Sequence, residues 1–239
     1  MERLYCELYT QMNLFMEKYP RCKERGLSLH VPMKGTRYNA QQRVRLMWIG
    51  RAINGWDDSS FFNLPIDDYL TKVKCLEESR TRFQWLKQYN YRHSPFWRAC
   101  KLLHQKLTLV EAPVEDWFED IVWTNLYNVA PADGGNPSGR LCKAQQVING
   151  QLLRKQIEAY SPTHIVFVTD SDWFFDFNRP EPAGTCLFPG VSAIPNTEDA
   201  VVASGTIGNG KVVVTKRPEY RFSDEVFTSS IIAAFQNIR

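Results

Sequence analysis

The chain has 239 residues, 44% of them hydrophobic, which is enough to bury a sizeable core in one large domain or two small ones. Its 29 Lys and Arg side chains against 26 Asp and Glu give a net charge of +3 at pH 7. This mild excess is compatible with a protein that contacts nucleic acid and with a metabolic enzyme. No apolar run approaches the roughly 18 residues of a membrane span, so no membrane partner is expected.

Leu4, Leu8, Met12 and Phe15 recur at helical spacing and predict a helix over residues 2–19. A polar stretch with several Gly and Pro breakers follows. Residues 44–49 are apolar and predict a buried strand that stops at Gly50. After a polar loop, residues 67–89 and 94–107 are predicted to be helical, with a break between them.

The second half of the chain repeats this alternation of strand and helix. Residues 121–126 and 164–169 predict two further strands, and residues 141–159 predict the helix between them. The Gly208-Asn209-Gly210 turn predicts a hairpin that joins residues 200–207 to residues 211–215, and a final helix is predicted after it. We therefore expect a single domain over residues 1–239, with the first helix packed on it. Its fold class is α/β: a three-layer α/β/α sandwich around a central, mostly parallel four-stranded sheet.

The six cysteines are widely spaced and include no C-x-x-C pair, so no metal ion, metal cluster or other cofactor is expected. Cys142 is expected to be a buried thiol. The four histidines show no ligand spacing. The amino terminus lacks the apolar core of a signal peptide, so reduced thiols and a cytoplasmic location are predicted.

Four segments that follow predicted strands carry a family resemblance, and ligands of such sheets bind at the carboxyl ends of the strands. The segments are residues 50–56, residues 123–137, the helix and strand over residues 142–168, and residues 213–219. In their order and residue types they resemble the uracil-DNA glycosylase superfamily. The resemblance implies a glycosylase-like fold and a site that binds DNA or another nucleobase-containing ligand.

The first motif departs from the family pattern at its acidic or amide position. That position aligns with Ala52, or with Arg51 if the glutamate-type variant is the better template. Neither side chain can act as a carboxylate, although Asp57 and its neighbour Asp58 lie close enough in sequence to substitute. Arg51, Ala52, Asn54 and Asp57 are therefore the candidate catalytic residues of this loop.

The last motif departs at its histidine, which aligns with Arg217, and Pro218 follows as in the family. An arginine keeps a positive charge and can stabilise an anion, but it cannot replace a neutral imidazole. Arg217 is thus a candidate catalytic residue and Pro218 a candidate substrate-binding residue. The alternative for Arg217 is a surface cation on a loop that ends a strand.

Asn125 is the best-preserved position of the resemblance, which implies that its amide binds the edge of a base. The alternative is an amide that bonds its own loop. Phe61 and Phe62 lie where the family keeps an aromatic residue that stacks on the extruded base. For at least one of them, ordinary core packing is the alternative. For Asp170 and Asp172, which follow the third strand, a cap of the next short helix is favoured over a catalytic or magnesium-binding role.

The resulting prediction is a divergent uracil-DNA glycosylase-like protein that binds a nucleobase or nucleic acid, with weak or no base excision. Whether the chain is an enzyme, a DNA glycosylase that hydrolyses an N-glycosidic bond, is left open. Two alternatives remain. One is a non-catalytic nucleic-acid or nucleotide-binding module on the same fold, and the other is a small-molecule hydrolase on a generic α/β fold.

Overall fold

The computed structural model describes residues 1–53, 61–79, 81–89, 91–109, 115–179, 186–195, 197–219 and 222–238, and it is a mixed α/β protein. Its strands are β1 (Leu27–Leu29), β2 (Met33–Lys34), β3 (Leu46–Ala52), β4 (Ile121–Tyr127), β5 (Val129–Pro131), β6 (His164–Val168), β7 (Val191–Ala193), β8 (Val201–Ile207) and β9 (Gly210–Thr215). Its α-helices are α1 (Glu2–Lys18), α2 (Pro20–Arg25), α3 (Ile66–Glu78), α4 (Trp85–Gln88), α5 (Pro95–Thr108), α6 (Gly139–Tyr160), α7 (Ser171–Asn178) and α8 (Asp224–Asn237). Short 3-10 turns are η1 (Phe61–Asn63), η2 (Arg82–Gln84), η3 (Tyr91–His93) and η4 (Trp117–Asp120).

Seven strands form one mixed sheet in the order β2-β4-β3-β6-β9-β8-β7. β4, β3, β6 and β9 are parallel, so the four predicted strands are confirmed as neighbours in one sheet. The pairings of β2 with β4, β8 with β9 and β7 with β8 are antiparallel. The predicted four-stranded, mostly parallel sheet is therefore too small, because antiparallel strands extend the parallel centre at both edges. The predicted hairpin is confirmed as β8 and β9.

Alternate side chains of the parallel strands enter two separate cores. Leu46 and Trp48 of β3 pack with α5 and α8, whereas Met47 and Ile49 pack with α6 and α7. β6 divides in the same way. Val166 and Val168 lie in the first core, and Ile165 and Phe167 lie in the second. Since both faces of these strands are covered, their sequences are continuous apolar runs rather than alternating ones.

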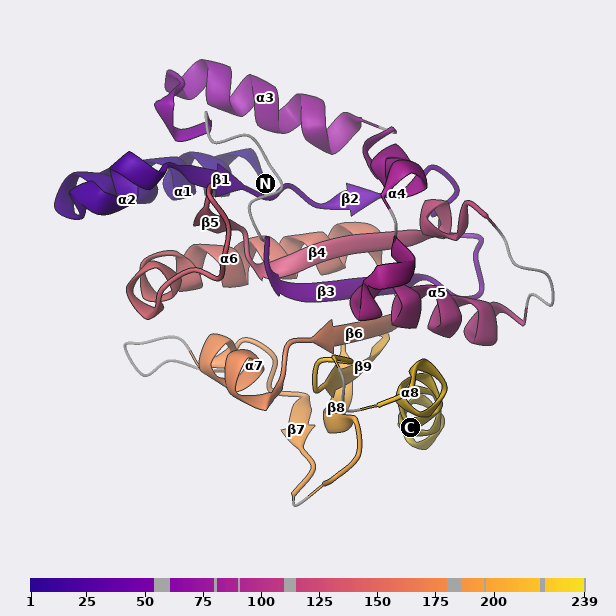
Figure 1. Ribbon diagram of the computed structural model, residues 1–239. Coiled ribbons are helices and arrows are strands. Elements are labelled where there is room, and N and C mark those ends of the chain that lie inside the picture. Colours follow the sequence, from indigo (N-terminus) through magenta and orange to yellow (C-terminus); the bar gives the residue numbers. More distant parts are fainter. Residues whose placement is uncertain are drawn as a thin grey trace.

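A third core lies beside the sheet and includes the predicted amino-terminal helix. Tyr5, Leu8 and Met12 of α1 are fully buried there, together with side chains of α3 and with Leu141 and Leu152 of α6. Figure 1 shows α1, α2 and α3 on the β4 side of the sheet, and α7 and α8 on the β9 side. None of the described helices is long and apolar enough to cross a membrane.

Two sequence predictions fail where short elements depend on their neighbours. The helix predicted over residues 67–89 ends at Glu78, because Ser79 is extended, and η2 and α4 follow separately. The polar stretch after α1 contains β1 and β2, which have three and two residues. β1 pairs with β5 and β2 with β4, so these strands form through partners that are distant in sequence.

Candidate functional site

The parallel strands bring the ends of β3, β4, β6 and β9 to one edge of the sheet. The register pairs Gly50 with Asn125, and Val168 with Thr215, across neighbouring strands. The described parts of the four segments with motif resemblance therefore meet at this edge, as predicted for a ligand site in a parallel sheet.

Asp170 connects three of these strand ends. Its carboxylate accepts a hydrogen bond from Arg51 Nη2 at the end of β3, and one from the backbone N–H of Arg217 after β9, at 2.9 Å. Arg51 Nε also donates to the Thr169 carbonyl at 2.9 Å, and the Asp170 N–H donates to the Thr215 carbonyl at 2.9 Å. Arg51 and Arg217, both predicted as site residues, thus share one carboxylate.

The prediction that Asp170 caps the following helix is wrong as to its side chain. Asp170 occupies the N-cap position of α7, but its side chain makes no capping hydrogen bond and binds Arg51 and Arg217 instead. Its backbone has φ 63° and ψ 162°, a region that is nearly restricted to glycine and costs about 1–3 kcal/mol. The two bonds to the arginines hold the chain in this conformation, because each oxygen has its own donor.

The charge of each arginine is matched by a neighbouring carboxylate. The Arg51 side chain is 17% exposed, and its guanidinium carbon lies 5.0 Å from the centroid of the Trp173 ring. Burial, and next the nearby Arg217, lower the pKa of Arg51. The Arg217 side chain forms an ion pair with Glu219. The arrangement is a strand-end cluster of two arginines and two carboxylates, in which each positive charge already has a negative partner.

The other predicted residues of the first motif lie apart from this cluster. Ala52 is half-buried and packs at the margin of the core that contains α6 and α7. Phe61 and Phe62 are almost completely buried in the third core, with ring centroids 6.1 and 5.8 Å from that of Tyr69. Their contacts are those of core residues, and their predicted stacking on a base stays a prediction. Asn54, Asp57 and Asp58 lie outside the described residues.

Asn125 is buried against the strand beside it. Its side chain is 2% exposed, and its Nδ2 has no hydrogen-bond partner in the described part of the chain. A Cβ atom at Gly50 would lie 2.4 Å from Asn125 Oδ1 and 3.6 Å from the Phe96 ring. Asn125 therefore lies on the α5 side of the sheet, and its Nδ2 makes no hydrogen bond to Arg51 or Arg217. Pro218 is buried in the loop that follows Arg217.

We expect Gly50→Ala to lower the free energy of unfolding by about 1–3 kcal/mol, because the added methyl group would displace the Asn125 amide from a packed position. Urea unfolding followed by circular dichroism measures the effect. Gly139→Ala is the matched control, since an added Cβ there meets no atom within 4 Å and the position is in α6. An equal stability of Gly50→Ala and the unmodified chain would contradict the tight contact.

A cavity of about 540 Å³ lies next to the cluster, between the end of β4, the start of α6 and α7. Trp173 belongs to both the cluster and the cavity, since the Arg51 guanidinium lies over its ring and the residue lines the cavity. The rings of Tyr127 and Trp173 are 5.8 Å apart at 73°, and Phe175 adds a third aromatic wall. The volume matches that of a small-molecule pocket. The sequence interpretation missed Tyr127 and Trp173, although each lies at or just beyond the end of a predicted strand.

Cys142 also lines this cavity, and its thiol, predicted to be buried, is half-buried. Burial raises its pKa to about 12, and its sulfur donates to the Pro137 carbonyl at 3.6 Å. It is therefore not a thiolate at neutral pH. Among the residues that the structure describes, His, Cys, Asp and Glu side chains form no group of three that could hold a metal ion.

A basic groove of about 850 Å³ adjoins the aromatic cavity at the first turn of α6. Its lining includes Lys18, Arg21, Arg140 and Lys143, and the cavity and the groove share Gly139 and Lys143. Arg140 lies 5.6 Å and Lys18 5.8 Å from the ring centroid of Tyr19. The first turn of α6 contains no acidic residue, so cations and the positive end of the helix face the same groove.

Comparison of the chain with models of known protein families gives no match, and comparison with curated proteins gives none either.

Proposed function

We propose that the chain is a divergent protein with a uracil-DNA glycosylase-like fold, a three-layer α/β/α sandwich. Two observations support this. Separate cores with helices cover the two faces of the parallel strands, and the described motif segments meet at the carboxyl edge.

The proposed function is binding of a nucleobase in an exposed or single-stranded nucleic acid. The observation that carries it is the shared border between an aromatic cavity and a cationic groove. The half-buried Trp173 offers a ring surface for a base, and stacking of one base is worth about 1–3 kcal/mol. Tyr127 is buried beside it, and the two rings meet edge to face. Arg21 and Arg140 in the adjoining groove would then contact the phosphates on one side of that base.

Base excision is proposed to be weak or absent. Excision requires groups that stabilise the sugar cation and the departing base anion as the glycosidic bond breaks. At the aligned positions the chain has Arg51 or Ala52 and Arg217. Arg51 is paired with Asp170, and Arg217 with Glu219, so neither guanidinium faces a ligand without a competing carboxylate. Loss of one such preorganised group typically lowers a rate by about 10²–10³-fold.

Fluorescence anisotropy with a labelled single-stranded 12-mer tests the binding proposal. The unmodified chain should bind, and Trp173→Ala should weaken binding by about 10-fold through the loss of one stacking surface. Tyr89→Ala is the matched control, because Tyr89 is an exposed aromatic residue at the end of α4, away from the cavity.

Absence of binding by the unmodified chain, or an unchanged affinity of Trp173→Ala, would contradict the proposal. A parallel glycosylase assay on oligonucleotides with uracil, mismatched thymine or hypoxanthine tests the chemistry. Rapid excision by the unmodified chain would contradict the statement that activity is weak, while leaving the binding site intact.

A further inference from the structure

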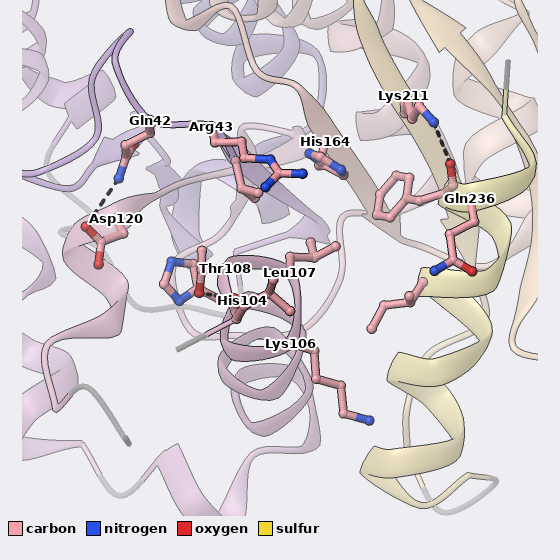
Figure 2. A pocket seen from close by; sticks show the side chains of 14 residues that line it. Gln42, Arg43, His104, Lys106, Leu107, Thr108, Asp120, His164, Lys211 and Gln236 are labelled. Carbon is pink, nitrogen blue, oxygen red and sulfur yellow. Dashed lines mark hydrogen bonds between the residues drawn. The ribbon is translucent and has the colours of Figure 1, made fainter. Parts of the chain in front are cut away.

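A second cavity lies at the opposite edge of the sheet, where the parallel strands begin. Its volume is about 610 Å³, and its lining includes Val44 before β3, His164 at the start of β6 and Lys211 in β9 (Figure 2). Residues from the last turns of α5 and α8 complete it. It shares no lining residue with the aromatic cavity, so it is a separate site.

The charge that this cavity offers to a ligand is positive. Arg43 is exposed and makes no hydrogen bond or ion pair within the described chain, and Figure 2 shows its guanidinium on the side of the cavity where His164 lies. The carboxylate in the lining, Asp120, is occupied: Arg37 donates to it at 2.9 and 2.8 Å, and Gln42 at 3.3 Å. A negatively charged group of a ligand would therefore meet Arg43 without competition from Asp120.

Of the two lysines in the lining, Lys211 contributes its positive charge to the cavity and Lys106 does not. The Lys211 ammonium donates to the Phe235 carbonyl at 2.8 Å, so it lies near the end of α8, and both residues line the cavity. Lys106 forms an ion pair with Glu225, and in Figure 2 its ammonium points away from Arg43 and His164. Arg43 and Lys211 are thus the cations that face the cavity.

The two histidines of the lining are neutral at physiological pH and supply directional polar groups. Burial, and then Lys211, lower the pKa of His164 to about 4, and burial lowers the pKa of His104. The Thr163 hydroxyl already accepts from the Arg45 N–H at 2.9 Å and lies 2.9 Å from His164 Nδ1, so its proton is available for that nitrogen. This favours the tautomer in which His164 Nε2 carries a proton and donates.

His104 adds a buried polar atom to the same lining. Its side chain is 3% exposed, and its Nδ1 has no hydrogen-bond partner in the described part of the chain. The cavity also has an apolar wall. It is formed by Val44, Leu107, Leu109, Ile232 and Phe235.

We propose that this cavity binds a small organic carboxylate with an apolar body, whose carboxylate contacts Arg43 and His164 and whose body lies against Leu107, Ile232 and Phe235. A guanidinium fork matches a carboxylate in two parallel hydrogen bonds. The volume exceeds that required by an inorganic anion and is in the range of small-molecule pockets. This inference is independent of the function proposed for the opposite edge.

Isothermal titration of the full chain with hexanoate, acetate, hexanol and inorganic phosphate tests the ligand class. Hexanoate should bind at least about 5-fold more tightly than each of the other three, because only it offers both the charge and the apolar body. Arg43→Gln should weaken hexanoate binding by at least about 5-fold. Arg92→Gln, at an exposed position in η3, is the matched control and should not change it.

Methyl NMR spectra locate the site, since hexanoate should shift the signals of Leu107 and Ile232. Arg43 is exposed and makes no hydrogen bond or ion pair in the described chain, so its replacement should not disturb folding. Three results would overturn the proposal: no hexanoate binding by the unmodified chain, equal affinities of the chain and Arg43→Gln, or binding of phosphate as tight as that of hexanoate.

Discussion

Replacement of Arg21, Arg140 and Arg179 together by glutamine should weaken binding of single-stranded DNA by about 100-fold or more at 50 mM salt. All three are exposed, Arg21 and Arg140 line the basic groove, and Arg179 lines the aromatic cavity that it adjoins. Each lost phosphate contact removes the release of condensed counterions, which supplies most of the affinity at low salt. Each phosphate contact with a single strand contributes roughly 0.7 to the slope of log association constant against log salt concentration. The slope should therefore become shallower by about 2 when three contacts are lost.

Anisotropy titrations between 50 and 200 mM salt measure both quantities. The matched control is the triple change of Arg3, Arg43 and Arg92 to glutamine, which removes the same charge from exposed positions elsewhere. An equal loss of affinity in the control would show that net charge, and not the groove, determines binding. Because the groove and Trp173 act on different parts of the ligand, Trp173→Ala should leave the salt slope unchanged.

Acidification from pH 6.5 to pH 4 should lower the free energy of unfolding, because three histidines have pKa values below those of the unfolded chain and must bind protons in this range. Three histidines are neutral: His30 and His104 are buried, and His164 is half-buried. Burial, followed by the charge of Arg82, lowers the pKa of His30 well below its usual value, and burial also lowers the pKa of His104. For His164, burial and then the charge of Lys211 lower the pKa from 6.5 to about 4. In this range the unfolded chain binds more protons than the folded one, so stability is complete above pH 6.5 and decreases as the pH falls.

His164 alone accounts for about 1–2 kcal/mol of this loss, after allowance for its partial exposure to solvent. Urea unfolding at half-unit steps of pH measures the slope, and His164→Gln should reduce it between pH 6.5 and pH 4. His93→Gln, at an exposed position, serves as the control. A stability that stays constant from pH 6.5 to pH 4 would contradict the neutral state of these histidines.

Elements with their own local pattern could be predicted from the sequence. The four parallel strands are apolar runs because both of their faces are buried, and the hairpin has a glycine, Gly208, at φ 56° in its turn. α1 has its buried side chains at helical spacing. β1 and β2 could not be predicted, because strands of three and two residues have no period of their own and form only through pairing with β5 and β4.

The site shows the same division. The rule that ligands bind at the carboxyl ends of parallel strands placed Arg51 and Arg217 at one edge, and the structure joins both through Asp170. The sequence did not indicate that Asp170 would bond to these arginines rather than cap α7, nor that Trp173 would lie against Arg51. Both depend on where α7 packs, which is decided by contacts between distant segments.

The sequence by itself determined the order of strands and helices, the central parallel strands and the strand-end position of the two arginines. Tertiary structure alone decided that the sheet has seven strands in the described part of the chain, and that a cavity with His104 and His164 opens at the amino edge. It also decided that both Phe61 and Phe62 lie in the core, where the sequence indicated core packing for at least one of them. The reason is physical. Local periodicity records which face of a segment is buried, whereas a cavity or an ion pair depends on the distance between side chains of different segments, which packing sets.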